Sequence, residues 1–224
     1  MSNTKIGTNE KNREKIRKLA LTGILCGIAI IMSFPFAGTI VLPAVSATVA
    51  FIPVIVATIM LGLKSGLMVA FVAGSASLVR SMVIPTMLAP YFLNPLVSIA
   101  PRMMIAVMVW LVFKGLMSIP LPKTFDRRPI VVAISGAIGS MTNTALVLGS
   151  IYLFHAAPLR NGEPLFANFA PPLTSTLANN DVLTAPGTWL FGIATANGGI
   201  ELIVNALVTT VVILTLRNAK FAKF

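Results

Sequence analysis

Six apolar stretches, separated by segments of unequal length, fill most of the 224-residue chain. Five are almost uninterrupted, and the sixth contains Asn and Gly. They cover residues 16–34, 47–63, 65–79, 101–113, 129–154 and 190–216. An apolar helix of roughly 18 residues or more can cross the ~30 Å hydrocarbon core of a bilayer. The pattern therefore predicts an all-α integral membrane protein with six transmembrane helices.

Composition supports this fold class and suggests one membrane domain between two short tails. Only 10% of the residues are charged and 56% are hydrophobic, whereas soluble domains carry about 25% charged residues. The mean hydropathy is +0.91. We expect tails at residues 1–15 and 217–224, a six-helix membrane domain at residues 16–216, and a location in the cell (plasma) membrane.

The placement of Lys and Arg predicts the orientation. Most of the 17 basic residues lie in the two tails, in the link between the second and third stretches, or in the link between the fourth and fifth. With six spans, all these segments are on one side, which is cytoplasmic because cytoplasmic loops are enriched in Lys and Arg. Both termini are then cytoplasmic. The net charge of +11 indicates contact with anionic headgroups rather than with nucleic acid.

The side chains that common catalytic and metal sites need are scarce. Cys26 is the only cysteine and His155 the only histidine, so the chain can form neither an intramolecular disulfide nor a cysteine-based metal site. No glycine-rich phosphate loop with a lysine is present, nor a usable Ser, His and Asp set. We predict no catalytic residue, no metal ligand and no cofactor.

Three ionisable residues lie in or beside the predicted spans. An ionisable side chain at the bilayer centre costs about 2.5–3.5 kcal/mol on insertion scales. Arg80 and Arg102 are at outer ends of spans, where they could snorkel to headgroups or face a pocket that binds a carboxylate or phosphate. Glu201 lies mid-span and forms, with Asn197 and Asn205, a stripe on one helix face.

This stripe cannot face lipid, because unsatisfied amide and carboxyl groups are too costly there. One interpretation is a hydrogen-bond network between helices. The other is a ligand site that includes Asn197 and Glu201, with the deeper Asn205 structural.

Two further amides are candidates for a ligand site. Asn143 lies near mid-membrane in the fifth span and could bind ligand or join helices. Asn94 is the one strong amide in the apolar outer segment 81–100. This segment and two others, at 35–46 and 155–189, are predicted to converge over the bundle and cover a cavity reached from outside.

A pair of small residues in the first span predicts close helix contact. Gly23 and Gly27 are spaced by four, the pattern that lets two membrane helices approach closely. The pattern fits packing inside this protein or docking to another membrane protein.

Several segments together resemble the S components, the substrate-binding subunits, of energy-coupling factor (ECF) transporters. The resemblance extends over about residues 15–216. It is carried by FIPV (51–54), LGLKSG (61–66), APR (100–102), GSMTNT (139–144), YLF (152–154) and ANGGIE (196–201). It implies a membrane subunit that captures a vitamin outside the cell and is not an enzyme. It also implies partners, namely a transmembrane coupling protein (T component) and two ATP-binding cassette ATPases that use the ATP.

Within that family the chain looks most like the pantothenate type. Pantothenate offers one carboxylate, one amide and two hydroxyls. The resemblance implies that Arg102 or Arg80 holds the carboxylate, and that Asn143 and Asn197 contact the amide and hydroxyls. Glu201 would accept from a hydroxyl or orient an arginine.

The resemblance also implies a docking role for the small pair. Gly23 and Gly27 match the positions through which S components dock, where alanines are commoner. Three alternatives stay open: an S component for another vitamin or precursor, a stand-alone secondary transporter, and an integral-membrane enzyme. Uptake that persists without ATPase partners would favour the secondary transporter.

Overall fold

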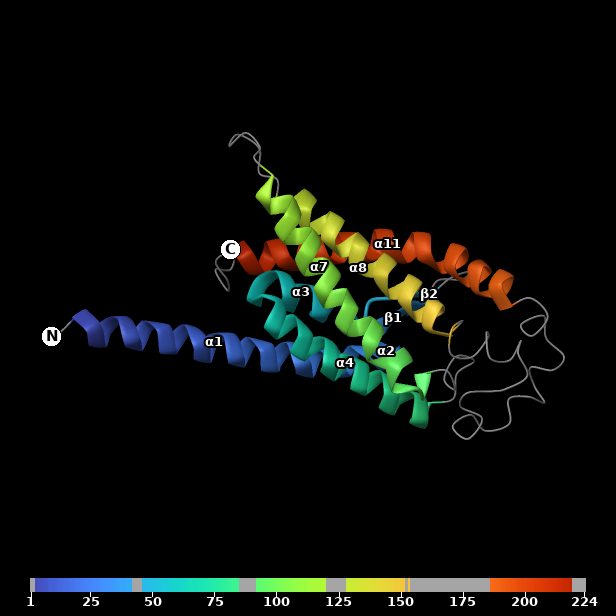
Figure 1. Cartoon of the computed structure of the whole chain (residues 1–224), viewed down its shortest axis with the longest axis horizontal. Helices are drawn as coiled ribbons and strands as arrows, with labels where there is room; N and C mark the ends of the chain where they lie inside the picture. Colours follow the sequence, from blue (N-terminus) through green and yellow to red (C-terminus); the bar gives the residue numbers. More distant parts are fainter. Residues whose placement is uncertain are drawn as a thin grey trace.

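Helices dominate the part of the chain that the structure describes. The computed structural model describes residues 3–41, 46–84, 92–119, 128–151, 153 and 186–218, with only the backbone for 3–11, 35–36, 39–41, 46–48, 151, 186–197 and 200. The long helices lie side by side as a bundle (Figure 1). They are α1 (Asn3–Met32), α3 (Ile52–Leu61), α4 (Leu63–Val83), α7 (Ala100–Ser118), α8 (Arg128–Ile151) and α11 (Pro186–Asn218).

Short elements connect some of these helices. They are α2 (Pro35–Gly38), β1 (Thr39–Val41), β2 (Ser46–Thr48) and α6 (Pro95–Ser98). The two strands pair antiparallel, with Thr39 opposite Thr48. The expected all-α architecture is therefore confirmed, and this hairpin is a small non-helical addition within the described residues.

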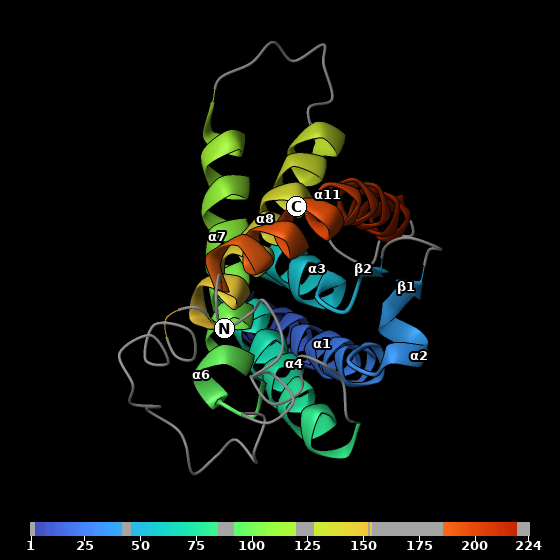
Figure 2. The ribbon, with the colours of Figure 1, turned by 90° about the vertical axis from the view of Figure 1, so that its right-hand side faces the viewer.

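The short helix α3 lies at the centre of the bundle. Residues 52–59 are all buried, and the helix contacts α1, α4, α7, α8 and α11 (Figure 2). Its 10 residues rise only about 15 Å, half of the hydrocarbon core. The helix predicted over 47–63 thus begins later than expected, because Pro53 favours a helix start and residues 46–48 pair in the hairpin.

A single glycine separates α3 from α4. Gly62 has a φ of 96°, a left-handed conformation that glycine adopts at little cost. Beyond it, Gly66 packs directly against the Thr58 side chain. The two helices therefore form a tight antiparallel hairpin, as the short link in the sequence predicts.

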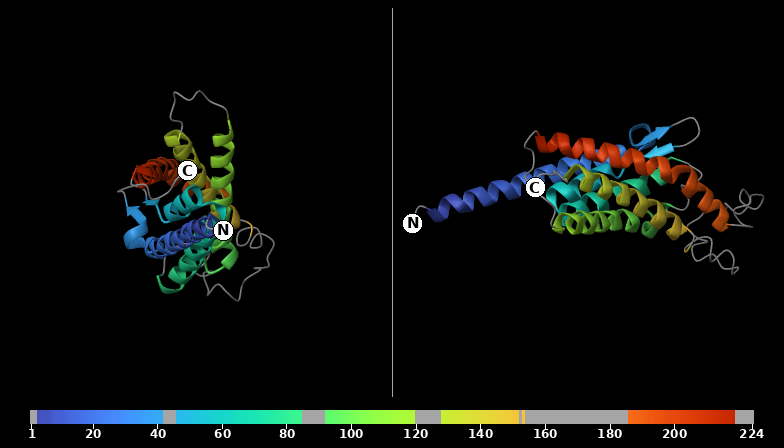
Figure 3. Two further views of the ribbon diagram at one scale, coloured as in Figure 1. Left: turned by 90° about the vertical axis from the view of Figure 1, so that its left-hand side faces the viewer. Right: turned by 90° about the horizontal axis from the view of Figure 1, so that it is seen from above.

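The helix ends agree with the predicted clustering of basic residues. α1 begins and α11 ends at the same end of the bundle, where the α3–α4 turn also lies (Figures 1 and 3). Lys64 and Arg217 belong to this end. By length and composition, three helical segments among the described residues could cross a membrane, namely Leu63–Val83, Pro95–Ser118 and Arg128–Ser150. Six spans and their orientation stay predictions.

Beside its apolar core, the bundle buries several polar side chains, and it exposes many large apolar ones. Buried polar residues include Ser98, Ser135, Ser140, Asn205 and Thr209. Large apolar side chains on the outside include Phe71, Leu111, Met141, Leu207 and Val211. A soluble protein buries mainly apolar groups, so this distribution supports a bundle surrounded by lipid.

We predict that Gly74→Ala destabilises the fold. A Cβ at Gly74 would lie 2.8 Å from the Ile99 Cα atom, so α4 and the start of α7 would be forced apart, at about 1–3 kcal/mol. A thermal melt of the purified protein in detergent measures the effect. Gly115→Ala is the matched control, because nothing lies within 4 Å of a Cβ there. Equal melting temperatures for Gly74→Ala and Gly115→Ala would contradict close packing of Gly74 against Ile99.

Candidate functional site

A polar seam joins α8 and α11 deep in the bundle. The Asn205 Nδ2 atom donates to the Glu201 carbonyl at 2.8 Å and approaches the Ser140 Oγ atom at 3.4 Å. One turn along, a Cβ on Gly136 would lie 3.2 Å from the Thr209 Cβ atom. Asn205 therefore links the two helices. This is the structural role that the sequence analysis assigned to it from its deep position in the span.

The register of this seam positions Glu201. The two helices run antiparallel, and Ser140 of α8 faces Asn205 of α11. One turn before Asn205 on α11 is Glu201, and one turn after Ser140 on α8 are Asn143 and Thr144. Glu201 therefore lies at the same level of the bundle as Asn143. Glu201 is only 6% exposed, so the predicted stripe faces the protein at Glu201 and Asn205. The side chain of Asn197 lies outside the described residues.

Arg102 is held in the first turn of α7. Its Nη1 atom donates to the Val97 carbonyl at 3.3 Å, and its guanidinium carbon lies 5.0 Å from the centre of the Phe92 ring, a cation–π contact. The Ser98 hydroxyl donates to the Phe92 carbonyl at 2.8 Å and braces that segment. The sequence analysis missed Phe92 and Ser98, because no spacing rule connects them to Arg102.

Arg80 also turns toward the protein. It lies in the last turn of α4, and its Nη1 atom donates to the Ser33 carbonyl at 3.3 Å. Within the described residues, its buried Nε atom has no hydrogen-bond partner. Both arginines bond backbone carbonyls of neighbouring segments, so the pocket-facing alternative is favoured over snorkelling.

The charges of the site do not balance within the described residues. In the part of the chain that the structure describes, the charged groups that act on Arg102 are Arg80 and Glu201. Arg102 therefore has one carboxylate and a second guanidinium group as charged neighbours. A buried charge without a counter-charge is costly, so this arrangement favours an additional anionic group.

Several buried polar atoms here lack partners among the described side chains. They are the donors Arg80 Nε and Asn94 Nδ2, and the acceptors Asn143 Oδ1 and Glu201 Oε1. Buried polar atoms in proteins are nearly always hydrogen-bonded, so these four atoms mark where a polar ligand could bind. Asn94 also has a local role, because its side chain accepts from the Leu96 N–H at 3.0 Å and caps α6.

The segments expected to cover the site are described only in part. Segment 35–46 contains α2 and β1, and segment 81–100 contains α6. Most of 155–189 lies outside the described residues.

The glycine pair of the first span is open. Gly23 and Gly27 are exposed, and nothing lies within 4 Å of a Cβ at either position. Packing inside this protein therefore does not explain them within the described residues.

The family model described as "ECF transporter, substrate-specific component" matches residues 17–213. No curated protein sequence matches the chain.

We predict that Glu201→Gln lowers the melting temperature of the ligand-free protein more than Arg102→Gln does. Among the described residues, the first change removes the carboxylate that acts on Arg102, whereas the second removes one of two neighbouring cations. We expect a drop of several degrees for Glu201→Gln, since about 1 kcal/mol corresponds to roughly 2–4 °C for a chain of this size. Thermal melts in detergent provide the comparison. A larger drop in melting temperature for Arg102→Gln than for Glu201→Gln would rule out an excess of positive charge at the site.

Proposed function

Because the chain belongs to the family of ECF transporter substrate-specific components, we propose that it is the vitamin-binding subunit of an ATP-driven importer in the cell membrane. The family consists of transport components and not of enzymes. Two observations on the described residues carry the proposal, namely the surplus positive charge at Arg102 and Arg80 and the four unpartnered polar atoms. The substrate would be a small polar molecule with one anionic group.

The surplus charge suggests how the anion binds. A carboxylate between Arg102 and Arg80 would neutralise the additional cation, with charge-assisted hydrogen bonds to one or both guanidinium groups. The unpartnered Arg80 Nε and Asn94 Nδ2 atoms are donors, so they suit carboxylate or carbonyl oxygens. The anionic end would therefore lie toward α4 and α6.

The unpartnered acceptors suggest which chemical groups the other end of the substrate carries. Asn143 Oδ1 and Glu201 Oε1 belong to α8 and α11, and both suit hydroxyl or amide hydrogens. Pantothenate has a carboxylate at one end, two hydroxyls at the other and an amide between them. We therefore propose pantothenate as the substrate, with Asn197 as a further contact.

We predict that the purified chain binds one pantothenate and that Arg102→Ala weakens binding at least ~10-fold. Loss of a hydrogen bond to a charged group costs about 1.5–3 kcal/mol. Isothermal titration calorimetry measures the affinity. The control is Lys114→Ala, an exposed cation near the other end of the same helix.

The alternatives give different results in that titration. Binding of another vitamin in place of pantothenate would keep the family function and replace the substrate. Unchanged affinity in Arg102→Ala would exclude its role as the anion ligand.

Transport requires partners that hydrolyse ATP. We propose that a T component and two ATP-binding cassette ATPases supply this step, and that the T component docks on α1 at Gly23 and Gly27. The proposal is supported by the open surface at both glycines, since small residues let another membrane helix approach the backbone. The chain itself needs no cofactor.

We predict that Gly23→Leu or Gly27→Leu blocks transport and leaves vitamin binding unchanged. The new side chains meet nothing inside the protein but would hold a partner helix away. Co-purification with the T component measures docking, and titration measures vitamin binding. Gly115→Leu, another open glycine on a different helix, should retain the partner. Normal co-purification of either α1 variant would rule out this docking site.

A further inference from the structure

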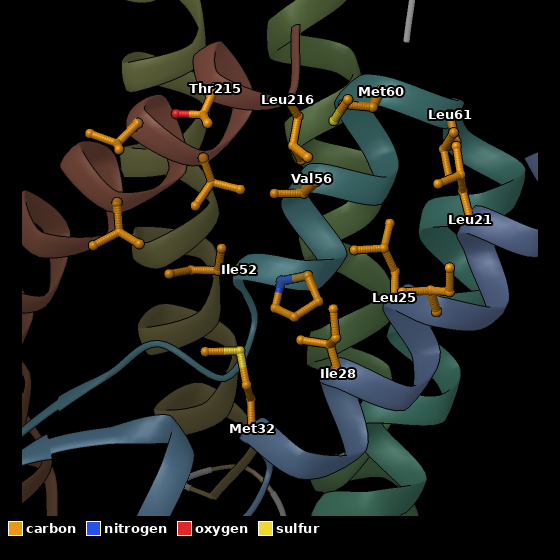
Figure 4. A pocket seen from close by; sticks show the side chains of 15 residues that line it. Leu21, Leu25, Ile28, Met32, Ile52, Val56, Met60, Leu61, Thr215 and Leu216 are labelled. Carbon is orange, nitrogen blue, oxygen red and sulfur yellow. The ribbon is translucent and has the colours of Figure 1, made fainter. Parts of the chain in front are cut away.

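A hollow in the bundle surface lies apart from the residues of the candidate vitamin site and extends along α3 from Ile52 to Leu61. This apolar hollow of ≈580 Å³ opens between α1 and α11, with α3 as its floor (Figure 4). Its lining includes Leu21, Ile28, Met32, Val56, Thr215 and Leu216. With the Thr215 hydroxyl as the one polar side-chain group of the lining, the hollow suits a hydrocarbon occupant.

The length of the hollow matches half of a bilayer. On α1 its lining extends from Leu21 to Met32, about 17 Å of helix. Half of the hydrocarbon core is about 15 Å. One acyl chain of a single leaflet therefore fits its length.

Cations border one end of the hollow. Lys18 is three residues before the lining residue Leu21, and Lys64 is three residues after the lining residue Leu61. Both lysines are exposed. Arg17 is one turn before Leu21, on the same face of α1. A negatively charged headgroup could therefore bind at the end where the acyl chain leaves the hollow.

We propose that this hollow binds an anionic phospholipid, with one acyl chain between α1 and α11 and the phosphate beside Lys18 and Lys64. Apolar contact provides the chain site, and each basic residue near the headgroup strengthens the preference for negative charge by about fivefold. The hollow borders the glycine face of α1, because Ile24 and Ile28 line it beside Gly23 and Gly27. Lipid in the hollow would thus form part of the surface that a membrane partner meets.

The test uses a fluorescent reporter at the edge of the hollow. Ile24 lines the hollow and is 60% exposed, so Ile24→Trp is introduced with Trp110→Phe and Trp189→Phe. The full chain is placed alone in phosphatidylcholine vesicles that contain brominated phosphatidylglycerol or brominated phosphatidylcholine. We expect half-maximal quenching at an at least fivefold lower mole fraction of the phosphatidylglycerol. Lys18→Gln with Lys64→Gln should reduce this preference below about twofold, whereas Lys114→Gln should preserve it.

Three results would overturn the proposal. Equal quenching by the two lipids would show that the hollow does not select an anionic headgroup and is ordinary lipid-facing surface. A preference that survives the double lysine change would place the anionic lipid elsewhere. No quenching by either lipid would favour a second copy of this chain as the occupant. Vitamin and partners are absent, so failure here leaves the proposed transport function untouched. Melting temperatures check that each variant is folded.

Discussion

The register between α8 and α11 determines where the polar groups of the candidate site lie. Inside a membrane bundle, Asn205 has few alternative partners, and Ser140 and the Glu201 carbonyl lie within its reach. A slip of one turn would separate Asn205 from Ser140, and an unsatisfied buried group costs about 1–3 kcal/mol. The same slip would move Glu201 away from the level of Asn143. One interhelical seam thus holds together two side chains of the site.

The site itself shows a conflict between stability and binding. Arg80 and Arg102 are anchored to carbonyls of neighbouring segments, so neither can easily turn away from the other. Among the described residues, Glu201 is the carboxylate that acts on Arg102, so this part of the ligand-free site carries an unfavourable excess of positive charge. Functional sites often retain such local costs because the ligand removes them.

Much of the architecture was predictable because lipid imposes simple rules. Long apolar stretches gave helices in the right order, and an ionisable residue such as Glu201 was conspicuous in an apolar segment. The length of α3 was not predictable, since pairing of residues 46–48 with β1 competes with an apolar pattern that continues through them. The Phe92 contact with Arg102 was also hidden, because tertiary packing and not periodicity brings the two together.

The hairpin of α3 and α4 joins two distant parts of the molecule. One residue, Gly62, joins its arms, and the close seat of Gly66 on Thr58 prevents them from sliding. The short arm forms the floor of the apolar hollow, while the last turn of the long arm carries Arg80. One continuous hairpin therefore connects a lipid-facing surface with a guanidinium group near the other end of the bundle.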